Sequence, residues 1–361
     1  MTKTQKDIAK RLHLSVTTVS KALANHPDIS EKTQERVSQT AKKMNYRVNR
    51  IARSLVQQKT NTIGVIMPEV HELFYVDVLN GIEAVTRARH YSLLLANAEN
   101  NPETEVRSIQ MLLENRIDGL LICPTEREDQ YMSLLKATRI PYVFFKNSPV
   151  SLQCDTVRID RELGAYQSVR HLIERGYEEV VFFYTLSHLT ESRNSVEGCR
   201  RAFLESGIPM ERLRLIDCSK GLESFHRKAM EEITYSGRRI GIFAWNDEMA
   251  IGVYRAIIEK GLIIPDQVGL VGFDDIPIAS FLPKALTTVR YPKFEMGKKA
   301  AEMLIRRIES PGGERPAVKG GGFSAPGAGP GKRSPKMIHG GESGDHEHLV
   351  LDLELVPRET T

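Results

Sequence analysis

The chain has 361 residues, 41% hydrophobic and 27% charged, with four cysteines and a net charge of +4. This length suffices for two or three domains with sizeable cores. No run of about 18 apolar residues occurs and no apolar leader precedes the first helix pattern, so we expect a cytoplasmic protein without a membrane span. The cysteines form no Cys-x-x-Cys pair, which argues against a disulfide framework or a zinc cluster.

Positive charge is concentrated near the N-terminus. Residues 1–60 contain thirteen lysines and arginines against four acids, a net charge of +9, so the rest of the chain carries −5. A basic head on an acidic body is typical of a nucleic-acid-binding module joined to a part with another task. The plainer alternative is a solvated basic helical bundle, but the helix pattern of the head favours DNA binding.

Residues 4–25 predict two short helices joined by a tight turn. Apolar residues at 8, 9 and 12 form the buried stripe of the first helix, and those at 19, 22 and 23 form that of the second. Ser15 is placed to cap the second helix. Its outward residues are then Val16, Thr17, Ser20 and Lys21, an arrangement that suits the major groove of DNA.

The head is expected to end early in the chain. A third helix begins at Ser30 and completes a head of residues 1–48, and a short amphipathic segment with a polar linker follows at 49–61. The body then occupies 62–361.

The body alternates between apolar runs and helix patterns. We predict strands at 63–67, 92–96, 119–123, 142–145, 156–159, 179–184, 213–217, 241–244 and 269–273, and a last strand from Leu349. The helices between them include 77–88, 103–114, 161–175, 195–205, 247–260 and 294–309. Such alternation is typical of parallel sheets covered by helices, and about 250 residues suit two sheets better than one. The predicted fold is therefore an all-α head followed by an α/β body of two Rossmann-like lobes.

Residues 311–348 interrupt this pattern with a Gly/Pro-rich sequence that has almost nothing apolar to bury, so we expect a flexible insert. His339, Asp345, His346, Glu347 and His348 near its end are a possible metal set, but local polarity is the simpler interpretation.

Several motifs occur in an order that identifies a family. Asp7-Ile-Ala-Lys-Arg and Leu14-Ser-Val-Thr-Thr-Val-Ser-Lys lie in the head, followed by Tyr46-Arg-Val-Asn-Arg-Ile-Ala-Arg-Ser-Leu55 and Thr62-Ile-Gly-Val-Ile. The body contributes Trp245-Asn-Asp-Glu-Met-Ala-Ile-Gly, Val271-Gly-Phe-Asp-Asp275 and Leu286-Thr-Thr-Val-Arg. Together these segments resemble the lactose/galactose repressor family of bacterial transcription factors. The resemblance implies a body like that of the periplasmic binding proteins.

The resemblance also implies a homodimer whose two heads read a near-palindromic operator in double-stranded DNA. By position, Val16, Thr17 and Lys21 are the base-edge readers, while Thr18 and Ser20 lie nearer phosphates and Ser15 opens the reading helix. The operator sequence stays open, because threonine can bond to several bases.

Asn49 to Gln57 resembles the hinge helix of the family, which folds in the minor groove. Leu55 occupies the position of a leucine wedge that kinks the DNA, and Ala52 lets two hinge helices approach closely. The alternative is that Leu55 anchors this segment to the body.

In the body, the resemblance implies a small effector between the lobes, commonly a sugar or nucleobase. Asn246 and Asp274 fall where the family hydrogen-bonds sugar hydroxyls, and both follow predicted strands. Phe74 and Tyr75 are expected to stack on a ring. Asp247 and Asp275 rank second, because helix capping is their alternative role.

The identity of the effector stays open. Where many members of the family place an arginine facing the ligand this chain has Ser195, and the nearest arginine is Arg193.

The sequence leaves two alternative functions open. A regulator controlled by a protein corepressor on the body surface is one alternative, and a sugar-binding protein without DNA is another. No phosphate-binding Gly-rich loop, Gly-x-Ser-x-Gly elbow or His-Glu-x-x-His helix indicates an enzyme. We therefore predict a transcriptional repressor, not an enzyme, with no cofactor and no metal.

Overall fold

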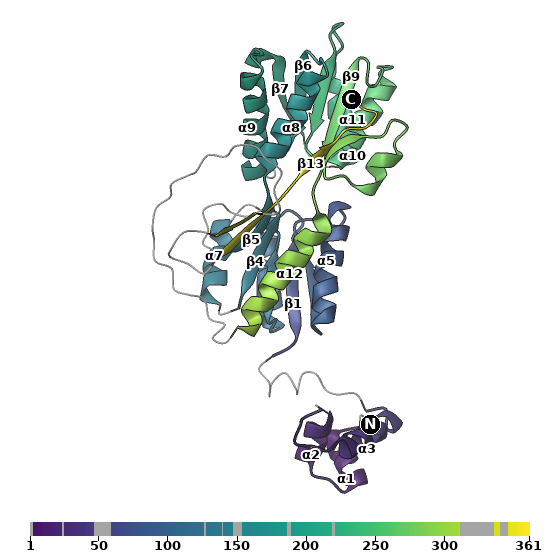
Figure 1. The fold of residues 1–361 in the computed structure, drawn as a ribbon, viewed down its shortest axis with the longest axis vertical. Helices are drawn as coiled ribbons and strands as arrows, with labels where there is room; N and C mark the ends of the chain where they lie inside the picture. Colours follow the sequence, from purple (N-terminus) through teal and green to yellow (C-terminus); the bar gives the residue numbers. More distant parts are fainter. Residues whose placement is uncertain are drawn as a thin grey trace. The chain divides into compact units, whose positions relative to one another are not determined.

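The computed structural model describes residues 3–23, 25–46, 59–125, 128–138, 140–146, 154–185, 189–218, 221–310, 336–339 and 346–361. The chain forms two compact units, residues 1–60 and 61–361 (Figure 1). None of the helices among these described residues is long and apolar enough to cross a membrane.

Among its described residues, the first unit contains three helices. They are α1 (Gln5–Leu12), α2 (Val16–Leu23) and α3 (Glu31–Lys43). The backbone N–H of Thr4 donates to Asp7 Oδ2 (2.8 Å), part of a capping box that starts α1. Ser15 caps α2 as predicted, since its Oγ accepts from the N–H of Thr18 (2.9 Å). One apolar side chain from each helix is fully buried where they meet, namely Ile8, Val19 and Val37.

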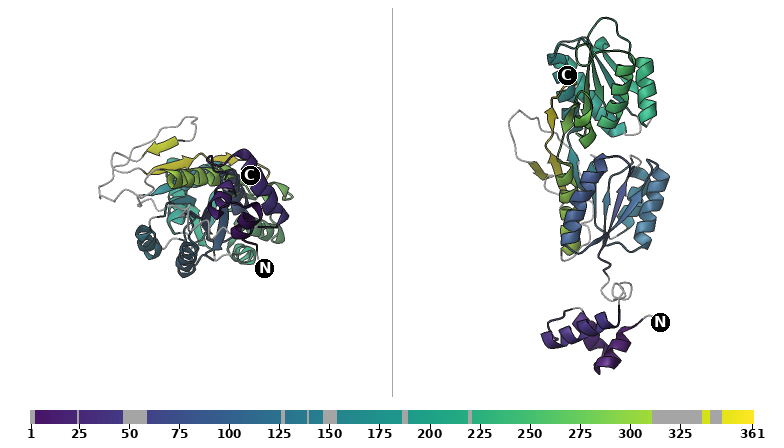
Figure 2. Two further views of the ribbon diagram at one scale, coloured as in Figure 1. Left: turned by 90° about the horizontal axis from the view of Figure 1, so that it is seen from below. Right: turned by 90° about the vertical axis from the view of Figure 1, so that its right-hand side faces the viewer.

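The first lobe of the body is built on a seven-stranded sheet in the order β11-β12-β5-β4-β3-β1-β2. The strands are β1 (Thr62–Met67), β2 (Ser92–Asn97), β3 (Gly119–Ile122), β4 (Tyr142–Lys146), β5 (Asp155–Ile159), β11 (Lys336–His339) and β12 (Glu347–Leu351). All neighbouring pairs are parallel except β11 with β12. One face is covered by α5 (Phe74–Ala88) and α12 (Lys293–Glu309), the other by α6 (Pro102–Glu114) and α7 (Glu128–Ala137) (Figure 2).

The two helices on the first of these faces pack closely because a glycine lies at their contact. A Cβ at Gly81 of α5 would come within 2.0 Å of the carbonyl oxygen of Phe294 in α12. A larger residue at this position would force the helices apart.

The second lobe has a six-stranded sheet in the order β13-β10-β9-β8-β6-β7. The strands are β6 (Glu179–Tyr184), β7 (Leu213–Asp217), β8 (Ile240–Ala244), β9 (Val268–Phe273), β10 (Thr287–Arg290) and β13 (Glu354–Val356). On one side α8 (Arg161–Glu174) packs against α9 (Leu189–Glu205), and on the other α10 (Leu222–Glu232) packs against α11 (Asp247–Glu259) (Figure 1). The described part of the lobe also includes two short 3-10 helices, η2 (Met210–Arg212) and η3 (Pro277–Phe281).

The chain passes between the two lobes after β5, after β10 and after β12. The last passage corrects the sequence prediction, which placed one continuous strand from Leu349 onward. Leu349 and Leu351 are buried in the first sheet, exposed Asp352 ends that strand, and β13 then joins the second sheet. Because both pieces are apolar, the sequence pattern alone does not reveal the change of sheet.

Besides β11, the sequence analysis did not predict α7, α10 or β10. The apolar stripe of α10 is narrow, with only Phe225 and Ala229 buried, and β10 contains a single aliphatic residue, Val289. The start of α9 was placed at 195, six residues after its observed start at Leu189.

The predicted insert was too long at its C-terminal end. Residues 336–339 form β11 and pair with β12, whose first residues, Glu347 and His348, also fall within 311–348. Residues 311–335 and 340–345 lie outside the described residues.

Candidate functional site

The outward face of α2 carries small side chains. Val16, Thr17 and Ser20 are exposed, and Val16 is 41% exposed despite being apolar. Thr18 is half-buried and its hydroxyl lies 2.8 Å from that of Ser15, so both hydroxyls already take part in the helix cap. The six predicted DNA-binding residues at α2 therefore fall into two groups. Val16, Thr17, Ser20 and Lys21 point outward, whereas the hydroxyls of Ser15 and Thr18 already take part in the helix cap.

Lys21 has an acidic partner in the head itself. Its Nζ lies 2.9 Å from Asp28 Oδ2, and both side chains are largely exposed. The hydrogen bond from Lys21 lowers the pKa of the Asp28 carboxyl. Contact between Lys21 and a guanine would require this pair to separate.

The predicted hinge residues Asn49, Ala52 and Leu55 lie outside the described residues.

In the body, an aromatic cluster forms at the carboxyl ends of strands from both sheets. It consists of Phe74, Tyr75, Trp245, Phe273 and Tyr291, which are all buried. The Phe74 ring lies 5.8 Å from the Tyr291 ring, which in turn lies 5.9 Å from the Phe273 ring. Phe74 and Tyr75 are only 2% and 1% exposed, so in this structure they are covered rather than presented to solvent.

One face of Phe74 is covered by a cation that the sequence did not point to. Lys146, at the end of β4, places its Nζ 4.0 Å from the centre of the Phe74 ring, and Glu72 lies 3.9 Å from the same nitrogen. Burial favours the neutral amine, but the charges of Glu72, Asp274 and Glu191 hold the pKa of Lys146 above its usual value. Lys146 of the first lobe thus interacts electrostatically with two acids of the second.

Asp274 is buried directly after β9, and its backbone has an unusual φ of +106°. Its Oδ1 accepts a hydrogen bond from the Tyr291 hydroxyl (2.7 Å), and Lys293 donates to its carbonyl oxygen. Burial and the Asp274 charge raise the pKa of Tyr291 well above its usual value. Positive φ is uncommon for residues other than glycine, and here these bonds hold the carboxylate in one orientation.

Asn246 is the N-cap of α11, because its Oδ1 accepts from the N–H of Met249 (2.8 Å). The suggested capping role of Asp247 and Asp275 was therefore wrong. Asp247 is buried and accepts from Thr288 Oγ1 (2.6 Å), and Asp275 pairs with Arg290 (2.5 Å) and with a second arginine, Arg358 (2.6 Å). The Asn246 Nδ2 group donates no hydrogen bond to the described residues.

Arg193 does not join the aromatic cluster, since it lies on the exposed side of α9. Ser195 is fully buried, and its hydroxyl has no partner among the described residues. A different arginine meets the cluster: Arg161, at the start of α8, stacks its guanidinium 3.7 Å from the Trp245 ring and 4.2 Å from the Phe273 ring. No local sequence signal marks Arg161, because the two rings come from strands about 85 and 110 residues later in the chain.

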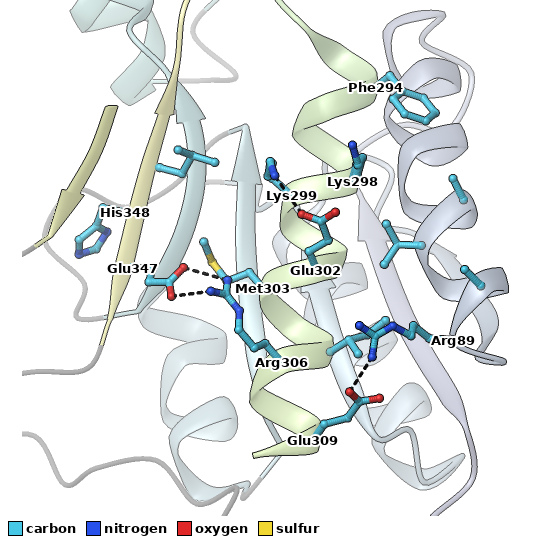
Figure 3. Close-up of a pocket in the computed structure, with 15 residues that line it drawn as sticks. Arg89, Phe294, Lys298, Lys299, Glu302, Met303, Arg306, Glu309, Glu347 and His348 are labelled. Carbon is cyan, nitrogen blue, oxygen red and sulfur yellow. Dashed lines mark hydrogen bonds and ion pairs between the residues drawn. The ribbon is translucent and has the colours of Figure 1, made fainter. Parts of the chain in front are cut away.

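A separate groove of about 680 Å³ lies on the first lobe between α5, α12 and β12 (Figure 3). Each of the four cations in it has an acidic partner. The pairs are Arg89 with Glu309 (2.9 Å), Lys298 with Glu295 (3.1 Å), Lys299 with Glu302 (3.0 Å) and Arg306 with Glu347 (3.0 Å).

Comparison with protein families assigns both units. Residues 4–49 match the model of the bacterial regulatory proteins of the lacI family, and residues 60–319 match that of the periplasmic binding proteins and sugar-binding domain of the LacI family. The chain belongs to the LacI family. This LacI-family chain is a DNA-binding transcriptional regulator and not an enzyme.

Individual relatives agree with this assignment. The LacI-family chain is 31% identical to the HTH-type transcriptional repressor PurR of Vibrio atlanticus over 309 residues, 85% of this chain and 92% of the relative. It is 29% identical to catabolite control protein A of Priestia megaterium over 305 residues, 83% of this chain and 91% of the relative. The lac repressor dimer bound to operator and the anti-inducer ONPF matches with a TM-score of 0.79 at 22% identity, over 100% of this chain and 99% of that chain. At that identity, the structural match supports the fold alone.

Proposed function

We propose that this regulator represses transcription in the cytoplasm as a homodimer that binds a near-palindromic operator through α2. In this proposal a small polyhydroxylated effector binds between the lobes and changes the affinity for DNA. The observation that carries the DNA-binding part is a capped helix with an exposed polar face in a head of charge +9.

Val16, Thr17 and Lys21 are the proposed base readers. Exposed Val16 suits apolar contact with a thymine methyl group, and Thr17 suits a hydrogen bond to a base edge. Ser15, Thr18 and Ser20 are proposed to position the helix at phosphates. Asn49, Ala52 and Leu55 are proposed to form the hinge that enters the minor groove, with Leu55 as the wedge.

For the effector, the proposed contacts combine hydrogen-bonding groups with rings. The Asp274 carboxylate accepts from hydroxyls and Asn246 donates through Nδ2, while Phe74 and Tyr75 provide apolar surface. Because Phe74 and Tyr75 are buried here, we propose that the lobes separate to admit the effector. Arg193, which is exposed on α9, is left out of this contact set.

The homodimer is proposed to form through the side of the second lobe covered by α10 and α11. Exposed apolar side chains occur on three neighbouring elements there: Leu222 on α10, Ile258 on α11, and Phe281 on η3, which is 80% exposed. Isolated exposed apolar residues are common, but several large ones on adjoining elements favour a protein interface.

Control by a phosphorylated protein is not favoured by the groove in Figure 3. Its four cations are each paired with a carboxylate, so a phosphate would have to displace those acids.

The DNA-binding part is tested by selecting operators from random duplex DNA with the full-length protein. We expect enrichment of a near-palindrome, and Thr17→Ala should relax the preference at one position in each half-site. Gln39→Ala, at an exposed position of α3, serves as the control and should leave the selected sequence unchanged. Enrichment of no palindrome would contradict the proposal.

A further inference from the structure

Arg161 is a buried cation, and the described residues provide acceptors for only some of its hydrogen-bond donors. Its side chain is 4% exposed and stacks on Trp245 and Phe273. Its Nη2 donates to the carbonyl oxygen of Trp245, but its Nε is buried and has no hydrogen-bond partner among the residues that the structure describes. In the parts of the chain that the structure describes, no carboxylate forms an ion pair with Arg161.

This state is costly for a guanidinium. A buried charge is normally paired, and an unsatisfied buried donor loses its bonds to water without replacement. Stacking on aromatic rings offsets part of that cost but offers no acceptor for the N–H. A group from outside the chain is therefore the natural partner of the Nε.

A second unsatisfied donor lies on the helix packed against α8. The Ser195 hydroxyl is fully buried without a partner among the described residues. One turn later, a Cβ at Gly198 would come within 2.2 Å of the carbonyl oxygen of Glu162, the residue after Arg161. This close approach puts Ser195 beside the start of α8, on the same side of the lobe as Arg161.

Acceptors occur at the other side of the aromatic cluster. Asp274 is bound to Tyr291, whose ring neighbours Phe273, the ring under Arg161. Arg161 can only donate hydrogen bonds, whereas an ionised Asp274 can only accept them. A ligand that satisfies both must present an acceptor at one end and hydroxyl donors at the other.

We propose that the effector is a sugar acid, a polyhydroxylated compound whose single carboxylate binds Arg161 and whose hydroxyls bind Asp274. The inference rests on the proposed effector site between the lobes and specifies its ligand. Carboxylate suits the site better than phosphate, because the charges of Asp274 and Glu191 act on Tyr291, the neighbour of the Phe273 ring under Arg161, and would repel a dianion more strongly than a monoanion. Arg161 would then supply the positive charge that many members of the family place where this chain has Ser195.

The chain offers an internal probe for this test. Trp245 is the only tryptophan in the sequence, and it stacks on Arg161, so its fluorescence reports directly on the proposed subsite. Full-length protein is titrated with matched pairs that differ in the carboxylate: D-glucose against D-glucuronate, and D-galactose against D-galacturonate. D-gluconate and D-glucose 6-phosphate complete the panel, and calorimetry provides the dissociation constants.

We expect at least one of the acids to bind roughly 10- to 100-fold more tightly than its neutral counterpart, the range for a charge-assisted hydrogen bond. Arg161→Gln should remove this preference while leaving the affinity for the neutral sugar within a few-fold. Arg193→Gln, an arginine of the neighbouring helix that is exposed, should preserve the preference. Asp274→Asn should weaken both members of the pair.

The outcomes separate this inference from the function on which it rests. If a neutral sugar binds as tightly as its acid, the effector site stands but the carboxylate assignment is wrong. If the phosphate binds best, the assignment is also wrong. If no compound binds and the Trp245 emission stays unchanged, both the inference and the proposed sugar-like effector fail. Should Arg161→Gln not fold, as judged by circular dichroism, the preference of the wild-type protein between the matched pairs decides the matter alone.

Discussion

At the scale of single residues, the ammonium group of Lys21 has two possible partners, Asp28 and DNA. In the free head it pairs with Asp28, and His26 lies 3.4 Å from the same Asp28 oxygen. On operator DNA the proposed role of Lys21 needs the same ammonium group for a base edge. Asp28 therefore competes with DNA for Lys21.

Asp28→Asn is expected to strengthen DNA binding. Removing the carboxylate frees Lys21 for a base edge and raises the net charge of the head, so affinity should rise a few-fold on operator and less on unrelated DNA. Binding is measured by fluorescence anisotropy over a series of salt concentrations. Glu35→Gln, which makes the same charge change at an exposed site on α3, is the control. Equal gains in the two variants would show that net charge, and not release of Lys21, accounts for the effect.

Leu55 is the second single residue whose mutation has a specific expected effect on DNA binding. If it is the wedge, Leu55→Ala should weaken operator binding by about 2–3 kcal/mol, since an unstacked base step loses its support. Binding to unrelated DNA should change little, because it depends on phosphate contacts. An equal loss on both kinds of DNA, measured in the same assay, would favour the alternative in which Leu55 anchors the hinge to the body.

At the level of elements, Asp155 joins three parts of the first lobe. Its carboxylate lies at the start of β5 and receives Arg307 of α12 through Nε (2.7 Å) and Nη2 (2.9 Å), and the N–H of Glu347 in β12 (2.8 Å). Arg306 and Glu347 form a second pair beside it. These bonds hold the end of α12 close to the start of β12, the two points between which the Gly/Pro-rich segment runs.

Asp155→Asn should destabilise the body by about 1–3 kcal/mol, because Arg307 loses its charged acceptor. Burial raises the pKa of Asp155, but the contacts of His346, Arg307 and the Glu347 N–H outweigh it and hold the pKa below its usual value. A lowered pKa means that this stabilisation is complete above the unfolded pKa of about 3.9 and is lost as the pH falls through the folded value. Urea unfolding of wild type and variant should therefore converge below about pH 4. A difference that stays constant at low pH would contradict this role.

The Gly/Pro-rich segment itself is expected to be dispensable. Replacing residues 319–334 with a short Gly-Ser link should leave the melting temperature and operator binding unchanged, because its composition cannot bury enough surface to contribute. A longer replacement, 319–344, is the matched comparison, since it also removes β11 and its pairing with β12. We expect only the longer replacement to lower the melting temperature, as followed by calorimetry.

At the level of the whole molecule, the operator proposal depends on two chains acting together. The second lobe has exposed apolar residues on both sides of its sheet. Phe281 ends η3, and the N–H of Lys284 just after it donates to the Tyr254 hydroxyl of α11, while Leu204 lies on α9, on the opposite side. Phe281 and Leu204 are similarly exposed, 80% and 68%, and so form a matched pair for mutation.

Phe281→Asp should convert the dimer to monomers, since burying a carboxylate in an apolar interface is unfavourable. Sedimentation velocity reports the change, and operator binding should fall steeply because each chain then holds one half-site. Leu204→Asp should leave the dimer intact. Dimers that survive Phe281→Asp, or dissociate with Leu204→Asp, would place the interface elsewhere.

Much of this architecture is determined by neighbours along the chain and was therefore predictable. Helix caps such as Ser15, the apolar faces of α1 and α2, and the buried runs that became β1, β6 and β9 depend on residues within a few positions of one another. The same local order placed Asn246 and Asp274 directly after their strands. Elements with little apolar content, such as α10 and β10, lacked that signal and were missed.

Contacts between distant parts of the chain were decided only by the tertiary structure. Arg161 meets Trp245 and Phe273, and Lys146 covers Phe74, because the carboxyl ends of parallel strands from two sheets converge at one place. Nothing in the sequence around Arg161 distinguishes it from an exposed arginine such as Arg193, since burial depends on residues that lie far away in the chain. The burial of Arg161 and its missing partner, and hence the proposed chemistry of the effector, follow from that convergence.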